Sequence, residues 1–444
     1  MAEKVTIVGA GLVGSLFAIL MAKKGYQVEI YERRPDMRKA KITVGRSINL
    51  ALSDRGWKAL EKAGITEDIK KVAIPMYGRM IHSIKGELNF QPYGKENQAI
   101  YSVSRGGLNA KLMDLAEAQP NVELFFNEKC VDVNLKSNEI TFENDSGETA
   151  KVSGDRIIGA DGAFSAVRAR LQFTDRFNYE QEYLEHGYKE LTIPPNEDGS
   201  FKLEKNALHI WPRGEYMLIA LPNEDGSFTC TLFFPFEGEK SFSTLKTEAD
   251  ILGFFQEIFP DVIPVMPTLV ADFQNNPTSS LVMTTCSPWN YEDKILLIGD
   301  ASHAIVPFYG QGMNSGFEDC TVLLEMFNKY NNDWAKILPE FSKTRKKDTD
   351  AIRKLALQNF IEMRDLVADP KFVLRKKIEA NFNKKHPKKW LPLYSMVTFS
   401  NIPYSEALRE GQKQEAIMEK VMGMEGIEHK WDSEEVENEI LKYL

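Results

Sequence analysis

The apolar positions at the start of the chain predict a strand, a helix and a second strand in quick succession. Lys4–Val8 is a short apolar run, and Gln27–Tyr31 is another. Between them, Leu12–Lys24 has the composition of a buried helix, and Gly25 stands where such a helix ends. This order is typical of an α/β fold with parallel strands.

Two more helices are predicted in the first part of the chain. Ser53 or Asp54 can cap a helix that runs to about Ala63, and Gly64 follows its end. Asn109–Ala118 has the pattern of the next helix. Their positions are consistent with helices that cover a parallel sheet.

A different pattern occupies the middle of the chain. Ala207–Trp211, Tyr216–Leu221 and Phe228–Phe234 are strand-like runs. The turns Arg213-Gly214 and Asn223–Gly226 separate them. Short strands joined by such turns predict an antiparallel meander, inserted between segments of the α/β domain.

A helical stripe of apolar residues marks the region after residue 350. Within Ala351–Val367 the apolar positions recur at helical spacing, and Asn359 falls on the same stripe. Pro370 is expected to end this helix. A buried amide needs a partner, since leaving it unpaired costs about 1–3 kcal/mol. A ligand or a hydroxyl such as that of Tyr394 would serve, and hydrogen bonding within the core is the alternative.

Composition narrows the class of protein without identifying it. A chain of 444 residues is too long for one compact core, so two or three domains are expected. The net charge of −9 disfavours nucleic acid as a partner. The four cysteines lack metal-ligand spacing, so free thiols are favoured and no metal site is expected. Without a signal peptide or an apolar run near the ~18 residues of a membrane helix, we expect a cytoplasmic protein with no membrane anchor.

Gly9, Gly11 and Gly14 form the pattern G-x-G-x-x-G between the first strand and the helix. The first glycine permits the tight turn, the second lets the backbone approach a pyrophosphate, and the third lets the helix pack closely on the strand. Glu32, at the end of the second strand, can bind the ribose hydroxyls of an adenosine. A glycine pattern alone can be coincidence, but strand, helix and terminal acid together favour a bound dinucleotide. The acid disfavours NADP as its occupant.

Two later motifs place further acids after buried strands. Asp161 follows Arg156–Ile158, and Asp300 follows Ile295–Ile298. The carboxylate of Asp300 is placed to accept a hydrogen bond from a ribityl hydroxyl of a flavin. A glycine-rich turn comes next, with a helix starting near Met313, whose N-terminus can stabilise negative charge on a reduced flavin ring. The alternative is a tight turn before a helix.

Two isolated residues carry weaker signals. Arg105, after a strand and before a helix, can contact the flavin or a phosphate, or form a surface ion pair. His303 could act as a catalytic base, but a lone histidine is more often structural. No side chain is therefore assigned as a certain catalytic residue.

The three motifs resemble those of the single-component FAD-dependent aromatic hydroxylases, the para-hydroxybenzoate hydroxylase type. The resemblance is closer to the kynurenine 3-monooxygenases within that group, in their bacterial form without a C-terminal membrane anchor. The segments that carry it are Gly45–Gly56, Gly78–Ser83, Gln91–Gly94, Val306–Asn314, Gln358–Arg364 and Leu391–Ser400.

The resemblance implies an α/β fold, with a Rossmann-like FAD-binding domain, an inserted antiparallel β-sheet substrate domain and a C-terminal helical region. The expected FAD-binding domain consists of residues 1–75, 99–180 and 280–340. The substrate-binding sheet domain consists of residues 76–98 and 181–279. Residues 341–444 form a helical domain that caps the substrate site.

The resemblance also implies a site. Arg79 and Tyr93 bind the carboxylate of the substrate, Asn359 and Tyr394 complete the clamp, and Pro307, Phe308 and Tyr309 wall the pocket. A surface charge is the alternative reading of Arg79. The cofactor-binding residues expected from motifs and resemblance together are Gly9, Gly11, Val13, Gly14, Tyr31, Glu32, Arg33, Arg34, Ala51, Arg105, Asp161, Asp300, Gly312, Met313 and Asn314.

The activity that the resemblance implies is hydroxylation of L-kynurenine to 3-hydroxykynurenine, in tryptophan degradation by the kynurenine pathway. FAD is the bound cofactor, NADPH and molecular oxygen are co-substrates, and the oxygen is transferred from a flavin C4a-hydroperoxide. Two alternatives stay open: an FAD hydroxylase of another aromatic acid, and a non-catalytic flavin-binding protein.

Overall fold

The computed structural model describes residues 3–39, 48–94, 98–367 and 369–444. The first three residues of the motif Gly45–Gly56, and those parts of the expected domains that fall in the gaps, lie outside the described residues. The chain forms two compact units. Their segments are Met1–Ile74, Tyr101–Leu184 and Ser280–Arg353 for the first, and Pro75–Ile100, Glu185–Ser279 and Lys354–Leu444 for the second. The three-part division stays a prediction of the sequence.

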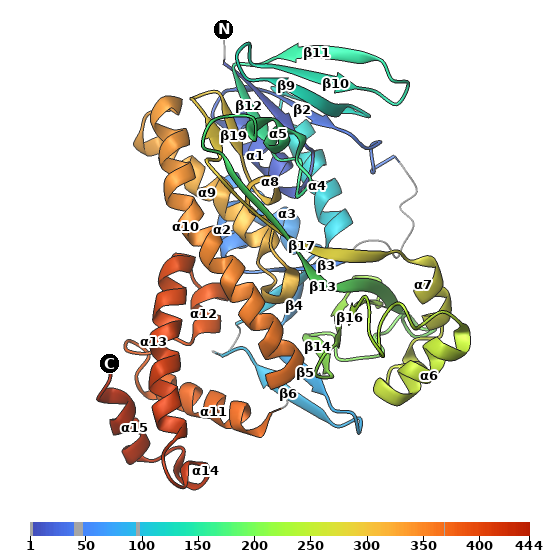
Figure 1. The fold of residues 1–444 in the computed structure, drawn as a ribbon, viewed down its shortest axis with the longest axis vertical. Coiled ribbons are helices and arrows are strands. Elements are labelled where there is room, and N and C mark those ends of the chain that lie inside the picture. Colours follow the sequence, from blue (N-terminus) through green and yellow to red (C-terminus); the bar gives the residue numbers. More distant parts are fainter. Residues whose placement is uncertain (1–2, 40–47, 95–97, 368) are drawn as a thin grey trace. The chain divides into compact units, whose positions relative to one another are not determined.

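The first unit is built on a six-stranded sheet (Figure 1). In spatial order its strands are β18 (Asn290–Tyr291), β19 (Ile295–Leu297), β12 (Arg156–Gly159), β1 (Lys4–Val8), β2 (Gln27–Glu32) and β8 (Val122–Phe126). All neighbouring pairs are parallel except β18 with β19. The predicted strand–helix–strand opening is confirmed, and its apolar residues lie in one continuous core.

Helices and small sheets complete this unit. The helices are α1 (Leu12–Lys23), α2 (Asp54–Ala63), α3 (Thr66–Lys70), α4 (Arg105–Glu117), α5 (Ala166–Leu171), α8 (Asp300–His303) and α9 (Gly312–Lys329). The small strands are β3 (Asn49–Leu52), β7 (Ile100–Ser104), β9 (Lys129–Asn134), β10 (Glu139–Glu143) and β11 (Thr149–Ser153). Strand β4 (Ile74–Met76) lies at the boundary of the units.

One predicted helix boundary is confirmed and another is wrong. Helix α2 ends at Ala63, as predicted, because Gly64 after it takes the left-handed conformation at φ +69°. Helix α4 begins at Arg105, four residues before the predicted start at Asn109. Ser104 caps it by accepting a hydrogen bond from the N–H of Gly107 at 3.2 Å. Arg105 is therefore the first helical residue rather than a linker residue.

The second unit contains the inserted sheet. Its seven strands lie in the order β17 (Thr278–Ser287), β13 (Asn178–Ile193), β16 (Phe228–Pro235), β15 (Met217–Pro222), β14 (Ala207–Pro212), β5 (Gly78–His82) and β6 (Leu88–Pro92). From β13 to β6 the neighbouring strands are antiparallel, except that β14 and β5 pair in parallel. The predicted meander is confirmed as β14–β15–β16. Strands β13 and β17 each run from one unit into the other. Helices α6 (Glu248–Ile258) and α7 (Leu269–Asn275), joined by η1 (Ile263–Val265), pack against the sheet core (Figure 1).

The C-terminal region is helical, as predicted, with different boundaries. Helix α10 (Trp334–Ile361) continues as a π-helical turn, η3 (Glu362–Leu366). Pro370 does not simply end this run: it is the first residue of α11 (Pro370–Lys385), where its missing N–H is harmless. The remaining helices are α12 (Leu393–Thr398), α13 (Tyr404–Met422), α14 (Ile427–Lys430) and α15 (Glu434–Leu441). None of the helices in the described part of the chain is both long and apolar enough to cross a membrane.

Candidate active site

The glycine loop between β1 and α1 has the shape that its sequence pattern predicts. Gly9 has a φ of +104°, and a Cβ there would lie 2.6 Å from the carbonyl oxygen of Ala160. A Cβ at Gly14 would approach the Gly9 carbonyl oxygen to 2.1 Å, so the helix packs as closely as glycine allows. At Gly11 nothing lies within 4 Å of the Cβ position. The backbone at Gly11 is therefore open to a ligand, as a pyrophosphate requires.

The N-terminus of helix α1 lies at this opening and is suited to bind a phosphate. Its N-cap is Gly11, which has no side chain to bond the first N–H groups, and its first turn contains no acidic residue. Free N–H groups and the positive end of the helix dipole favour a phosphate. The fit to a dinucleotide rests on this combination of an open backbone and an uncapped helix.

The carboxylate of Glu32 ties the end of β2 to the glycine loop. One oxygen accepts a hydrogen bond from the N–H of Ala10 at 3.0 Å. The other accepts hydrogen bonds from the N–H and Nε of Arg34 at 3.1 and 2.7 Å. Glu32 is buried, whereas Arg33 and Arg34 are exposed. The acid that the sequence assigns to a ribose therefore lies beside the phosphate loop.

The side chain of Tyr31 belongs to the core of this unit. Its ring is stacked between Phe125 and Phe142, with ring centres 4.7 and 4.2 Å away and interplanar angles of 13°. Its backbone carbonyl accepts a hydrogen bond from the N–H of Gly9 at 2.8 Å. The residue thus supports the glycine loop through its backbone.

Two acids follow the neighbouring strands β12 and β19. Asp161 accepts hydrogen bonds from the N–H groups of Ala166 and Val167 at 2.7 and 3.3 Å, and so caps α5. Burial raises the pKa of Asp161, and its Oδ1 has no partner among the described residues. Asp300 is exposed, but the protein around its carboxyl displaces water and so raises its pKa. The positive charge of Arg105 acts to lower that pKa.

These acids share one edge of the sheet with the glycine loop. Because β1, β2, β12 and β19 are parallel, the residues that follow them lie at their common carboxyl ends. The chain passes from β1 to β2 on one side, and β12 pairs with β1 on the other. Ligands of open α/β sheets bind in the crevice at such a switch point.

The turn before α9 is held by Asn314. Its amide donates hydrogen bonds to the carbonyl oxygens of Ala51 and Gly310 at 2.8 and 2.7 Å, and accepts one from the N–H of Ser53 at 2.9 Å. Asn314 is fully buried. At Gly312, the first residue of α9, a Cβ would have one neighbour within 4 Å, at 3.9 Å. The uncapped start of α9 therefore has an open backbone, like that of α1.

The expected pocket wall lies just before this turn. Pro307, Phe308 and Tyr309 form a single 3-10 turn, η2, in which Phe308 and Tyr309 are buried. Met313, in the first turn of α9, is buried as well. Val13 fills the space between α1 and α9, since a Cβ at Gly316 would meet its side chain at 2.5 Å.

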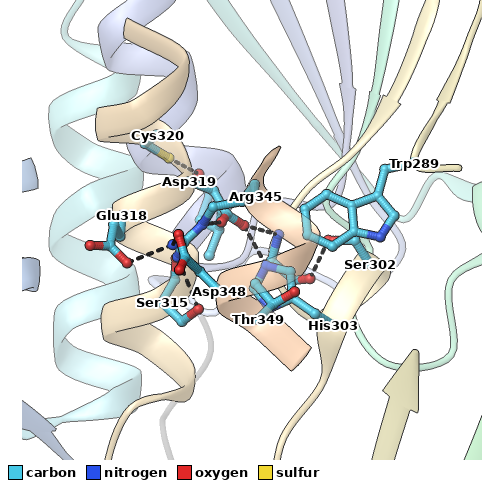
Figure 2. A network of polar contacts seen from close by, with 12 residues as sticks. Trp289, Ser302, His303, Ser315, Glu318, Asp319, Cys320, Arg345, Asp348 and Thr349 are labelled. Atoms are coloured by element: carbon cyan, nitrogen blue, oxygen red, sulfur yellow. Dashed lines mark hydrogen bonds and ion pairs between the residues drawn. The ribbon is translucent and has the colours of Figure 1, made fainter. Parts of the chain in front are cut away.

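A buried ionic network surrounds Asp319 (Figure 2). Asp319, on α9, accepts hydrogen bonds from the N–H of Gly299 at 2.9 Å, from Nε2 of His303 at 2.6 Å and from Nε of Arg345 at 2.8 Å. Arg345 also pairs with Glu318 at 2.7 Å. Burial alone would raise the pKa of Asp319, but His303 and Arg345 hold it below its usual value. His303 is therefore paired with a buried carboxylate.

The residues expected to clamp the substrate lie together in the second unit. Tyr93, just after β6, and Tyr394, in α12, have stacked rings with centres 5.3 Å apart at an angle of 11°. The guanidinium carbon of Arg79 lies 4.7 Å from the centre of the Tyr394 ring and 6.0 Å from that of Tyr93. Phe399 closes the group, 5.8 Å from Tyr93. Arg79 lies within β5 and is buried, so it is not a surface charge.

One acid in this cluster was missed by the sequence argument. Glu362 lies 3.4 Å from Nη1 of Arg79, at the first position of η3. It is three residues after Asn359, which is buried in α10, so the two share a helical face. That spacing was the only available signal. Burial opposes the charge on Arg79, but Tyr394, Glu362 and Tyr93 hold its pKa above the usual value.

Two polar atoms of the clamp have no partner within the described structure. They are Nε of Arg79 and the hydroxyl of Tyr93, both inaccessible to solvent. Burial raises the pKa of Tyr93 well above its usual value, so its hydroxyl keeps its proton and is available as a donor. A buried polar atom left unpaired costs free energy, so these two donors fit a ligand that offers acceptors.

Comparison with known proteins agrees with this arrangement. A family model described as an FAD binding domain matches residues 2–351. A kynurenine 3-monooxygenase from Flavobacterium psychrophilum is 54% identical over 443 residues, which cover 100% of this chain and 98% of the relative. One from Dictyostelium discoideum is 45% identical over 436 residues, covering 95% and 93%.

Solved structures share the fold at lower identity. The tetrameric form of 2-methyl-3-hydroxypyridine-5-carboxylic acid oxygenase matches with a TM-score of 0.67 and 18% identity, covering 83% of this chain and 94% of that one. PqsL, a probable FAD-dependent monooxygenase from Pseudomonas aeruginosa, matches with a TM-score of 0.65 and 18% identity, covering 82% and 98%. The matches to full-length relatives and to the family model show that the chain belongs to the kynurenine 3-monooxygenase family of FAD-dependent enzymes.

Proposed function

We propose that this chain hydroxylates L-kynurenine to 3-hydroxykynurenine, using FAD, NADPH and molecular oxygen. Relatives that are named for this reaction match the chain over essentially its full length. The observation that carries the proposal is a buried guanidinium with an unpaired Nε, beside a buried tyrosine hydroxyl that also lacks a partner. An α-amino acid carboxylate supplies acceptors for both donors.

The first unit holds the cofactor in this proposal. Gly9, Gly11 and Gly14 cradle the pyrophosphate, and Glu32 binds the adenosine ribose. Asp300 would bind the ribityl chain, and the N-terminus of α9 would stabilise negative charge on the flavin ring. The remaining first-unit residues assigned to FAD are Val13, Tyr31, Arg33, Arg34, Ala51, Arg105, Asp161, Gly312, Met313 and Asn314. When bound, FAD supplies the transfer of electrons from NADPH to oxygen and the activation of that oxygen for transfer to the substrate.

The clamp of the second unit binds the amino-acid end of the substrate. Arg79 binds the carboxylate with the paired donors of its guanidinium, a geometry that lysine does not offer. The hydroxyl of Tyr93 donates a hydrogen bond to the same carboxylate. Glu362 lies beside Arg79 and can accept hydrogen bonds from the substrate ammonium, with Asn359 and Tyr394 completing the set. Opposite charges in one small site suit a zwitterion.

The chemistry needs little proton transfer from the protein. The amine on the kynurenine ring enriches the neighbouring carbon in electrons, so no side chain has to generate the nucleophile. Positioning and exclusion of water are what the protein contributes. Pro307, Phe308 and Tyr309 supply an apolar wall for this purpose.

The test is NADPH oxidation by the purified, FAD-loaded chain, measured with and without a panel of aromatic amino and carboxylic acids. We expect L-kynurenine to stimulate the rate and to appear as 3-hydroxykynurenine in proportion to NADPH consumed. If only another aromatic acid stimulated NADPH oxidation and were hydroxylated, that acid and not L-kynurenine would be the substrate. Bound FAD without any stimulated oxidation would indicate a non-catalytic flavin-binding protein.

A further inference from the structure

A line of four groups crosses the core of the second unit beside the clamp-bearing strand. Nδ1 of His82 lies 3.1 Å from Oδ2 of Asp261, and Nε2 of His82 lies 2.9 Å from Nδ1 of His209. Nε2 of His209 lies 2.8 Å from the carbonyl oxygen of Glu204. Both histidines are buried, with 3% and 1% of their surface exposed. The flavin chemistry proposed above uses none of these groups.

Counting donors and acceptors shows that this line contains an extra proton. A carboxylate and a carbonyl at its two ends can only accept hydrogen bonds. Three contacts therefore need three N–H groups. Two neutral imidazoles supply two, because each carries one N–H and one lone pair. Without a third proton, one contact would set a lone pair against a lone pair at hydrogen-bond distance.

The two other candidates for the third proton are disfavoured. Although burial raises the pKa of Asp261, hydrogen bonds from His82 and Trp211 hold it below its usual value, so this carboxyl is ionised. Trp211 donates its Nε1–H to the same oxygen, Oδ2, at 2.7 Å. Burial lowers the pKa of His209 to about 4, so this ring is neutral. The remaining position is His82, with protons on both ring nitrogens.

The neighbours of His82 are compatible with a cation. From the residues after α6, Asp261 faces it with negative charge. From β14, His209 is neutral and Trp211 stacks on the ring, with centres 3.9 Å apart at 24°. An aromatic face favours a cation. Arg213 is the positive group nearby, and it donates to the backbone carbonyl of His82 at 2.9 Å and to that of Ile258 at 2.7 Å.

This cation fixes the strand that carries Arg79. His82 ends β5, three residues after Arg79, and side chains this far apart on a strand point to opposite faces. The bonds of His82 tie β5 to β14 and to Asp261 on one face, while Arg79 stacks on Tyr394 on the other. We propose that His82, held as an imidazolium between Asp261 and His209, is a positioning residue for Arg79. The positioning role rests on the proposed function, whereas the protonation of His82 does not.

The protonation can be measured on the unaltered, FAD-loaded chain. Six histidines are present, so ring-nitrogen NMR signals can be assigned by single His→Gln variants. At about pH 7 we expect both ring nitrogens of His82 to carry protons, and His209 to be neutral with its proton on Nε2. A neutral His82 signal would overturn the proposal. An imidazolium at His82 in a chain that fails to hydroxylate kynurenine would instead overturn the proposed function alone.

The positioning role is tested by the variants His82→Gln and Asp261→Asn. We expect KM for L-kynurenine to rise about tenfold, while kcat stays within about twofold and bound FAD is unchanged. Asp261→Asn keeps the result measurable if His82→Gln fails to fold. The control is His429→Gln, an exposed histidine of α14 in the same unit, which should leave both constants unchanged. An unchanged KM in the folded variant, or an equal KM increase in the control, would overturn the positioning role.

Discussion

The guanidinium of Arg79 lies on the face of the Tyr394 ring, 4.7 Å from its centre, although the two residues come from opposite ends of the chain. Tyr394 in turn stacks on Tyr93, so one cation and two tyrosines form a single packed group. This packing fixes the guanidinium plane before a ligand arrives. Pre-organisation of this kind reduces the entropy that binding has to offset.

The first prediction concerns this cation. Arg79→Met should leave FAD bound but raise KM for L-kynurenine by about ten- to a hundredfold, because a lost charge-assisted hydrogen bond costs about 1.5–3 kcal/mol. Steady-state kinetics and the flavin absorbance of the purified variant measure the two effects. Arg409→Met is the matched control, since Arg409 is exposed and its ion partners among the described residues are acids of its own helix, Glu406 and Glu410. An unchanged KM in Arg79→Met would exclude Arg79 as the carboxylate partner.

The second prediction separates two glycines of one loop. Gly11→Ala adds a methyl group that meets no protein atom, so without FAD its stability should stay within about 0.5 kcal/mol of the parent. The same methyl should obstruct the pyrophosphate and weaken FAD binding. Gly14→Ala clashes with the Gly9 carbonyl and should destabilise the chain itself, by about 1–3 kcal/mol or more. Melting temperatures of the FAD-free proteins measure stability, and FAD titration measures binding. Full FAD affinity in Gly11→Ala would contradict the assignment of this loop to the pyrophosphate.

The third prediction concerns the cysteines, which are free and buried at all four positions. Burial raises the pKa of Cys130 and of Cys286 to about 12, and raises those of Cys230 and Cys320 as well. The thiolate is the reactive form, so the native chain should not react with a disulfide reagent such as Ellman's, whereas the unfolded chain should. Ser146→Cys, in an exposed turn, provides a positive control. Rapid reaction of a native thiol without unfolding would contradict the burial.

The sequence predicted most of what local rules determine. The opening β1–α1–β2 unit and the β14–β16 meander follow from apolar periodicity and turn residues, and both are confirmed. The start of α4 was placed too late because Gly106 and Gly107 are poor helix formers, yet Ser104 caps a helix that includes them. Local propensity fails where a cap and packing outweigh it.

The sites depend more on contacts between distant segments. The resemblance named Arg79, Tyr93, Asn359 and Tyr394. The spacing from Asn359 puts Glu362 on the same helical face, but the contact of Glu362 with Arg79 required the structure. Likewise, the contact between His82 and His209 depends on the parallel register of β5 and β14, where Met80 pairs with His209. Register and buried unpaired atoms are properties of the assembled chain, so they required the structure.

The fourth prediction concerns the buried carboxylate of Asp319. Asp319→Asn should destabilise the chain at about pH 7 by about 3–5 kcal/mol, because it leaves Arg345 and His303 without their shared charged partner. The pKa of Asp319 is lowered in the folded chain, so its charge contributes stability above the unfolded pKa of about 3.9. That contribution is lost as the pH falls through the lower, folded value.

The stability difference between the parent and Asp319→Asn should therefore shrink below about pH 4. Apparent melting temperatures over a pH series, with and without FAD, measure this. Asp333→Asn is the matched control, because Asp333 is only partly buried, directly before α10, and its lowered pKa comes mainly from the surface partner Lys336. That variant should change stability far less at every pH. If the deficit of Asp319→Asn were the same at low and neutral pH, the loss would come from packing, and the charge of Asp319 would not be what stabilises the Gly299–His303 segment.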